Sequence, residues 1–401
     1  MPDSHRMGPT RPGARLKSVD AVRGFALFGV LLVNMYNFGA YSPEWTDSID
    51  RFFQTLMHSV FETKSWRLFS MLFGFGFAMQ MAKMLKADGG SAGFYIRRLV
   101  ILFVIGMGHA LFYDGDILME YALFGLFLIP FRKLRSGILL VLSVILIAAF
   151  PVGNMIHTYY GFESQTYEED SLPLAERRVG HPYLGSVGEM VEENAAVIPP
   201  RIWTRLHGPE SSLAIFAMFL LGLNIGRSRI LEDVARHRVL ILRVFSGGMT
   251  IGVLFALLEW LLGRYFGYVV FEEGSASIGM QFLGDFLFAY GSTALALGYA
   301  SAIVLLSQRR SWAPVLRPFE NLGRMALTVY LSGTLMFSTL FYGYGFGQLF
   351  LLGPAKTTAY AVLFFVIQVV FCSWWLSRFR FGPAEWLWRS LTYWKVQPLR
   401  I

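Results

Sequence analysis

About ten apolar stretches alternate with short polar segments along the 401-residue chain. Most of these stretches approach the roughly 20 residues that a membrane-spanning helix needs. The pattern therefore predicts an all-α protein, a polytopic transmembrane helix bundle of about ten spans. The predicted spans cover approximately residues 22–38, 66–84, 99–112, 117–131, 137–156, 212–225, 239–262, 282–306, 325–342 and 360–376.

The polar segments between the spans alternate in charge. Arg15 and Lys17 precede the first span, whereas Glu44, Asp47 and Asp50 follow it, and the same alternation continues to the end of the chain. Arg and Lys collect on the cytoplasmic side of a membrane because they are translocated less readily than Asp and Glu. The charge pattern therefore predicts that both termini lie in the cytoplasm.

One long polar segment, residues 157–210, interrupts the series of spans, and acidic residues outnumber basic residues in it. Because five predicted spans precede it, we place this segment outside the cytoplasm. The chain then forms one membrane domain with five parts. These are a cytoplasmic segment 1–20, spans one to five in 21–156, the extracytoplasmic segment 157–210, spans six to ten in 211–377, and a cytoplasmic segment 378–401.

Composition agrees with a membrane protein, since 55% of the residues are hydrophobic and only 15% are charged, against about 25% charged in soluble domains. The net charge of +8 follows from basic residues in short loops, so we expect membrane lipids as partners and no nucleic acid. Cys372 is the only cysteine, which excludes an intrachain disulfide and a cysteine metal site. The histidines lack metal-ligand spacing, and we expect no metal.

Two polar residues fall deep inside predicted spans, where such groups cost free energy and mark functional candidates. His109 follows Arg98, and Asn34 follows Arg23, by the same number of residues. At the helical rise of about 1.5 Å per residue, both lie roughly 16 Å inside the bilayer. His109 and Asn34 are therefore predicted at comparable depth.

The turn at residues 114–116 folds spans three and four into a hairpin. This hairpin brings His109 near Asp116 and level with Glu120. Either carboxylate could accept a hydrogen bond from one imidazole nitrogen, which leaves the other nitrogen to act as a base. The alternative interpretation is structural: His109 bonds a backbone carbonyl, and Asn34 joins neighbouring helices.

Asp20 and Arg23 are three residues apart at the start of span one. This spacing suits an ion pair on one helix face. The guanidinium of Arg23 is also suited to an anionic headgroup or a phosphate. The glycine-rich run at residues 72–77 is interpreted as a place of close helix approach.

Several segments of the chain, in order, resemble the YeiB-like family of bacterial membrane proteins. These segments are residues 18–34, 72–76, 108–109, 114–118, 323–328 and 382–389. The first span is also similar to the transmembrane acyltransferase superfamily, which includes the acyltransferase-three enzymes and heparan-alpha-glucosaminide N-acetyltransferase. The similarity lies in Asp20, the pair Arg23-Gly24, and Asn34.

This resemblance implies a multi-pass protein of the bacterial cytoplasmic (inner) membrane. It implies acyl transfer from cytoplasmic acyl-CoA, as a co-substrate, to a glycan or lipid acceptor on the other side. Asp20 and Arg23 would lie near the CoA, and Asn34 near the reacting carbonyl. Those enzymes carry a catalytic histidine at or soon after span one, whereas here no histidine stands between Asn34 and His58, so the role falls to His109.

Two other hypotheses stay open at this point. A proton-coupled transporter or flippase would use His109, Glu120 and Asp285 as a proton relay. A partner subunit would use the same motifs for packing alone. The sequence does not show the half-helices broken by Gly and Pro that are typical of transporters, which favours the enzyme. A homo-oligomer is compatible with the sequence.

Overall fold

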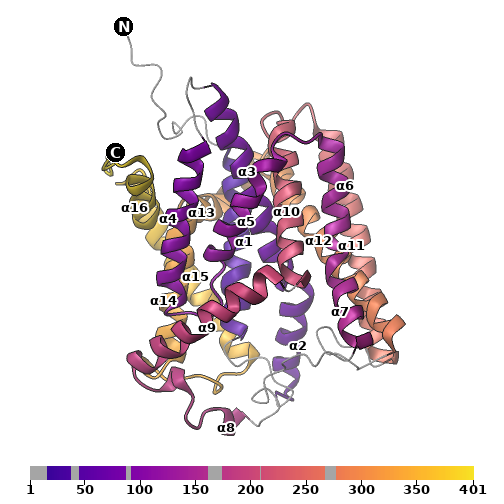
Figure 1. The fold of residues 1–401 in the computed structure, drawn as a ribbon, viewed down its shortest axis with the longest axis vertical. Helices are drawn as coiled ribbons and strands as arrows, with labels where there is room; N and C mark the ends of the chain where they lie inside the picture. The colour runs from indigo at the N-terminus through magenta and orange to yellow at the C-terminus, as the bar shows by residue number, and fades with distance from the viewer. Residues whose placement is uncertain (1–15, 38–44, 87–91, 161–173, 208, 267–276) are drawn as a thin grey trace.

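The protein is a bundle of helices in the computed structural model, which describes residues 16–37, 45–86, 92–160, 174–207, 209–266 and 277–401 (Figure 1). These ranges contain helices and no β-strand, which confirms the all-α prediction for them. The helices in the body of the bundle are α1 (Lys17–Asn37), α3 (Lys64–Lys86), α4 (Ala92–Ala110), α5 (Leu118–Phe131), α6 (Ser136–Ile147), α7 (Ala149–Tyr160), α10 (Pro209–Ser228), α11 (Arg238–Phe266), α12 (Ile278–Leu306), α14 (Ala326–Phe341) and α15 (Pro354–Leu376).

Within the described ranges, six helical segments are long and apolar enough to cross a membrane. They are α1, 93–110 of α4, the consecutive α6 and α7, α11, α12 and α15. The apolar helices α5, α14 and 212–228 of α10 are shorter. Together these segments coincide with every predicted span except 66–84, which α3 occupies. That helix carries Lys64, Arg67 and Gln80 among its apolar residues.

Close backbone contact joins α3 to α10. Gly74 of α3 lies against the backbone of Phe219, and Gly222 of α10 lies against the backbone of Met71. A Cβ atom at either glycine would collide with the facing main chain. The missing side chains therefore allow these two helices to cross with their backbones nearly touching.

The exposure of the long helices distinguishes the centre of the bundle from its periphery. In the most apolar window of each helix, 72% is buried inside the bundle for α1, against 11% for α11 and 22% for α15. Apolar side chains such as Val253 and Leu257 of α11 are exposed in the isolated chain. The faces of α11 and α15 therefore suit contact with lipid, and α1 is a central helix.

Further helices lie at the two ends of the bundle, outside the predicted spans. The segments α13 (Ala313–Arg324) and α16 (Pro383–Tyr393) lie at one end, and α9 (Val187–His207) crosses the opposite end (Figure 1). The remaining short elements are α2 (Ser48–Leu56), the π-helix η2 (Met57–Phe61), α8 (Leu174–Arg177), and the 3₁₀ turns η4 (Pro182–Leu184) and η5 (Arg310–Trp312).

The helix α9 belongs to the polar segment 157–210, of which residues 161–173 and 208 lie outside the described ranges. It is fastened to the bundle through Asn194, which is fully buried. Asn194 Nδ2 donates to the carbonyl of Leu111 at 3.1 Å, and Asn194 Oδ1 accepts from the Tyr183 hydroxyl at 2.8 Å. The described part of this segment is therefore an ordered cover.

The basic residue Arg15 and the acidic residue Glu44, used for the orientation, lie outside the described ranges.

Candidate functional site

His109 lies in the last turn of α4 and is buried, with 8% of its surface exposed. Its Nδ1 is 2.7 Å from Oδ1 of Asp116, which is 2% exposed. With Nδ1 donating to the carboxylate oxygen, Nε2 is the ring nitrogen that can act as a base. The turn at residues 114–116 returns the chain toward α4 and so creates this contact.

Asp116 is itself held in place at the start of α5. Its Oδ2 accepts a hydrogen bond from the backbone amide of Met119 at 2.9 Å. A carboxylate is favoured near a helix N-terminus because the free amides and the helix dipole are positive there. The orientation of His109 therefore depends on how α5 begins.

The second nitrogen of His109 faces α14. Its Nε2 is 2.7 Å from the hydroxyl oxygen of Thr334. One turn earlier on α14, the ring of Tyr330 packs against the imidazole with a centroid distance of 5.0 Å. The hydroxyl of Tyr330 accepts from the amide of Ile117 at 3.3 Å. His109 is thus enclosed by α4, α5 and α14, and a hydroxyl group already occupies the position next to Nε2.

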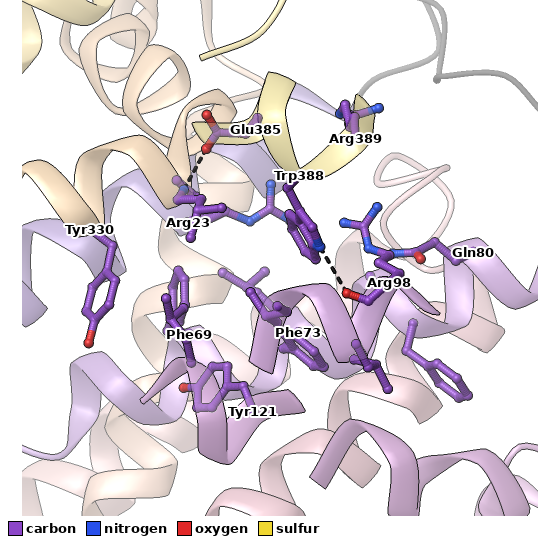
Figure 2. Close-up of a pocket in the computed structure, with 18 of the residues that line it drawn as sticks. Arg23, Phe69, Phe73, Gln80, Arg98, Tyr121, Tyr330, Glu385, Trp388 and Arg389 are labelled. Carbon is purple, nitrogen blue, oxygen red and sulfur yellow. Dashed lines mark hydrogen bonds between the residues drawn. The ribbon is translucent and has the colours of Figure 1, made fainter. Parts of the chain in front are cut away.

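A pocket of about 250 Å³ lies between α3, α4, α5, α14 and α16 (Figure 2). Figure 2 shows Arg23, Arg98 and Arg389 on one side of it, and Phe69 and Tyr121 on the other. Arg324 also lines the pocket. The apolar lining is formed by Phe69, Leu72, Phe73, Phe77, Leu99, Leu102, Leu118, Ala326 and Leu327. The pocket therefore combines several guanidinium groups with an apolar and aromatic interior.

The apolar part of the pocket adjoins the histidine. Leu118 and Tyr330 belong to the lining, whereas His109 does not. The ring of Tyr330 therefore contacts both the pocket and the imidazole of His109. The pocket and the His109–Asp116 pair are therefore neighbouring parts of one site.

The short helix α16 forms the arginine-rich wall. The indole Nε1 of Trp388 donates to the carbonyl of Arg98 at 2.9 Å, and the Arg98 guanidinium lies 3.9 Å from the centre of that ring. Such cation–π contacts orient a guanidinium without neutralising its charge. The charge of Arg98 thus stays available to an anion in the pocket.

Glu385 attaches α16 to the beginning of α14. Its Oε1 accepts from the amides of Leu327 and Thr328 at 2.6 and 3.1 Å, and its Oε2 accepts from the Thr328 hydroxyl at 2.6 Å. Burial raises the pKa of this carboxyl, and the hydrogen bonds from Thr328 and Leu327 oppose that rise. Because α16 lies after the last predicted span, Glu385 is a group at the edge of the membrane domain.

The structure places the remaining predicted residues as follows. Arg23 pairs with Asp20 at 2.9 Å and donates to the carbonyl of Gly323 at 3.3 Å, and it also lines the pocket. Asn34 is half-buried on α1, and no hydrogen bond between it and His109 is described. Glu120 is near Ser212, whose hydroxyl lies 3.4 Å from Oε1. Of the two carboxylates considered for His109, Asp116 makes the contact, and the catalytic roles of all these residues stay predictions.

The proposed relay residues have different partners among the described hydrogen bonds. Asp285 is fully buried and accepts from Asn154 Nδ2 at 3.0 Å, while Glu120 is near Ser212 and His109 contacts Asp116. Within the described residues, no group of three or more His, Cys, Asp or Glu side chains is placed to hold a metal ion.

Sequence reasoning overlooked several lining residues. It used Arg98 as a marker of depth and included Arg324 and Arg389 in segments that resemble a family, but it assigned none of the three to a site, although each lines the pocket. Thr334 and Tyr330 carry no local signal of their own, because a hydroxyl residue in an apolar helix commonly bonds the preceding turn. They lie one turn apart on α14, and only the packing of α4 beside this helix shows that both contact His109.

Comparison with known proteins gives relatives along almost the whole chain. Residues 225–395 match the family described as "Protein of unknown function (DUF418)". The chain is 31% identical to the uncharacterized protein YxaH of Bacillus subtilis, covering 98% of this chain and 97% of the relative. It is 27% identical to the uncharacterized protein YeiB of Escherichia coli, covering 94% and 95% of the two chains. An uncharacterized protein encoded beside an amylase in Bacillus acidopullulyticus is also 27% identical, over 98% of both chains.

Proposed function

This chain belongs to the YeiB-like family, and from its pocket we propose that it is a membrane acyltransferase. It moves an acyl group from cytoplasmic acyl-CoA to an extracytoplasmic glycan or lipid acceptor. The observation that carries the proposal is the proximity of an arginine-rich pocket with an apolar interior to a buried His109–Asp116 pair, with Tyr330 in contact with both. Each part suits one portion of an acyl-CoA reaction.

The proposal orients the protein with the α16 end of the bundle in the cytoplasm. The chain lies in the bacterial inner membrane with about ten spans and with both termini inside, as the charge alternation predicts. The arginine side of the pocket then opens toward cytoplasmic acyl-CoA. The acceptor approaches His109 from the end that α9 covers.

The donor occupies the pocket with its phosphates at the arginines and its acyl group among the phenylalanines. Guanidinium groups bind phosphate through paired, charge-assisted hydrogen bonds. Arg23 is already bonded to Asp20 at one side, so Asp20 acts by positioning it. The volume of about 250 Å³ admits only part of the donor, since whole-ligand pockets usually measure about 300–1,000 Å³. The nucleotide therefore extends outside.

In the reaction, Nε2 of His109 takes the proton of the acceptor hydroxyl, and the acceptor oxygen attacks the thioester carbonyl carbon. The carbon–sulfur bond breaks, and His109 returns the proton to the departing CoA thiolate. The contact between Nε2 and the Thr334 hydroxyl marks the position that the acceptor hydroxyl would take. Asp116 orients the ring, and Asn34 donates a hydrogen bond to the developing oxyanion. Single oxyanion donors of this kind contribute about 10²–10³ in rate.

The experiment is the release of free CoA from labelled acetyl-CoA by the purified protein in liposomes. Wild type is compared with His109→Ala and Asp116→Asn. We expect either substitution to lower CoA release by about 10²–10⁴-fold, the usual contribution of a positioned general base. His237→Ala is the matched control, because His237 lies in the loop before α11 and bonds the backbone of Asp233.

A result in which His109→Ala keeps wild-type turnover while the protein stays folded would contradict the assigned role. If wild type neither binds nor cleaves acyl-CoA of any chain length, the acyltransferase proposal is wrong. Uptake or efflux that collapses with the proton gradient would then favour the transporter hypothesis.

A further inference from the structure

Two polar side chains on the α3–α4 side of the pocket each have a buried atom with no hydrogen-bond partner among the described residues. The hydroxyl of Tyr95 is buried and has no described hydrogen bond, and only 2% of this residue is exposed. The Oε1 atom of Gln80 is likewise buried without a partner, and no hydrogen bond is described for its amide nitrogen. Both side chains line the pocket. Buried polar groups are nearly always hydrogen-bonded, so these two exceptions require an explanation.

Both residues are held in place by their neighbours. The ring of Phe77 packs on that of Tyr95 with a centroid distance of 4.7 Å, and Gln80 follows Phe77 by one turn of α3. Arg98 follows Tyr95 by one turn of α4 and lines the pocket beside Gln80 (Figure 2). The unpartnered groups therefore lie at the boundary between the arginines and the apolar interior.

We propose that Gln80 and Tyr95 form a subsite that recognises an amide group in the acyl donor. This inference rests on the proposed function and specifies the donor class as a thioester carried on an arm that contains both amide and phosphate groups. The side-chain amide of Gln80 has an acceptor oxygen and two N–H donors, and the phenol of Tyr95 has one O–H donor whose oxygen also accepts. The complementary partner is a group with both an N–H and a C=O, as in an amide.

The competing donor class is a phospholipid, which also has phosphate and acyl chains. Its ester oxygens are acceptors only and would leave an acceptor of the subsite without a donor. A site with unpaired polar groups disfavours a ligand that cannot satisfy them. The subsite thus selects for the pantetheine-type arm, with the phosphate at Arg98 and the thioester directed toward Tyr330.

The test measures binding of three probes to the purified full-length protein in detergent. The probes are acetyl-CoA, 4′-phosphopantetheine and lysophosphatidic acid. The lysophosphatidic acid is methylated at its glycerol hydroxyl, so that it has neither an amide nor a glycerol hydroxyl donor. We expect Tyr95→Phe and Gln80→Leu each to weaken the first two probes by about tenfold, the usual effect of losing one buried hydrogen bond. If lysophosphatidic acid binds, these substitutions should change its affinity by no more than about twofold relative to wild type. Tyr290→Phe is the matched control, because its hydroxyl bonds the carbonyl of Val144 outside the pocket.

The outcomes separate the subsite from the proposed reaction. If Tyr95→Phe and Gln80→Leu bind acetyl-CoA as tightly as wild type, the subsite inference is overturned while the acyltransferase proposal stands. If wild type binds lysophosphatidic acid but neither amide-containing probe, the subsite inference and the acyltransferase proposal are both overturned. If binding of 4′-phosphopantetheine depends on Gln80 and Tyr95 but no CoA is released, the subsite inference is supported and the proposed reaction fails.

Discussion

The glycine-rich run in α3 shows how single residues with the same sequence signal differ in their surroundings. The sequence assigned residues 72–77 as a whole to close helix approach. Gly74 agrees with that interpretation, because it touches the backbone of Phe219. Gly76 does not, because an added Cβ there would meet no atom within 4 Å, and Gly76 lines the pocket. Gly76 therefore keeps part of the pocket open.

This difference leads to a prediction about acyl chain length. Gly76→Leu should fit the fold, since it extends into the pocket, and it should reduce the space for an acyl chain. We expect binding of octanoyl-CoA to fall by about tenfold or more relative to acetyl-CoA, since each methylene that a pocket rejects changes affinity by roughly 10–200-fold. Gly247→Leu, also without neighbours within 4 Å but outside the pocket lining, is the control. An equal effect on both ligands would contradict the assignment.

At the scale of elements, the π-helix η2 connects α2 to the long α11. His58 Nδ1 contacts Glu62 at 2.9 Å, and His58 Nε2 contacts Glu259 of α11 at 3.3 Å. The Nζ of Lys64 donates to the carbonyl of His58 at 2.9 Å. Burial alone would lower the pKa of His58, but its hydrogen bonds and charge interactions with Glu259 and Glu62 outweigh burial and raise that pKa from 6.5 to about 9. The imidazolium therefore joins two carboxylates from different elements.

A dependence of stability on pH follows from this connection. Because the pKa of His58 is higher in the folded protein, its stabilisation is complete below pH 6.5 and is lost as pH rises through about 9. We expect this loss to lower the melting temperature by about 1–2 °C, a small effect because partly exposed ion pairs contribute little. His58→Ala should remove the decrease between these pH values, and His237→Ala should retain it. If the melting temperature depends on pH in the same way in wild type and in His58→Ala, the contacts of His58 with Glu62 and Glu259 do not stabilise the folded protein.

At the scale of the whole molecule, the bundle has two different ends. The pocket is lined at one end by Trp388 and Arg389 of α16, whereas α9 crosses the opposite end, where Arg178 donates to the carbonyls of Gly347 and Leu349 (Figure 1). His109 lies between these two ends of the bundle. A reaction with its donor and its acceptor on opposite sides of a membrane would require two such different ends.

The orientation of these ends is itself testable. In a Cys372→Ser background, single cysteines replace Ser186 before α9, or Ser228 and Ser377 at the other end, all of which are exposed. We expect a membrane-impermeant maleimide to label Ser186→Cys in intact spheroplasts, and to label the other two only after lysis. The reverse pattern would show that the arginine-rich pocket faces the outside and would contradict donation from cytoplasmic CoA.

The candidate site was partly predictable because one of its contacts is local. His109 and Asp116 are separated only by a short turn. Asn34 was predicted from its depth and from the resemblance of the first span, and neither of these fixes the direction of a side chain. The unpartnered pair Gln80 and Tyr95 had no sequence signal, since each has an ordinary role in a helix.

The amino-acid pattern predicts the helical class, the positions of most helices and the turn after which Asp116 or Glu120 could meet His109. These properties follow from hydropathy and short-range geometry, which act over one or two turns of chain. The pocket is visible only in the folded protein, because its walls come from helices distant in the chain. The bond between Trp388 and Arg98, which are 290 residues apart, depends on how α16 packs on α4. Such packing is set by the shapes of many side chains together, and no single segment of the sequence encodes it.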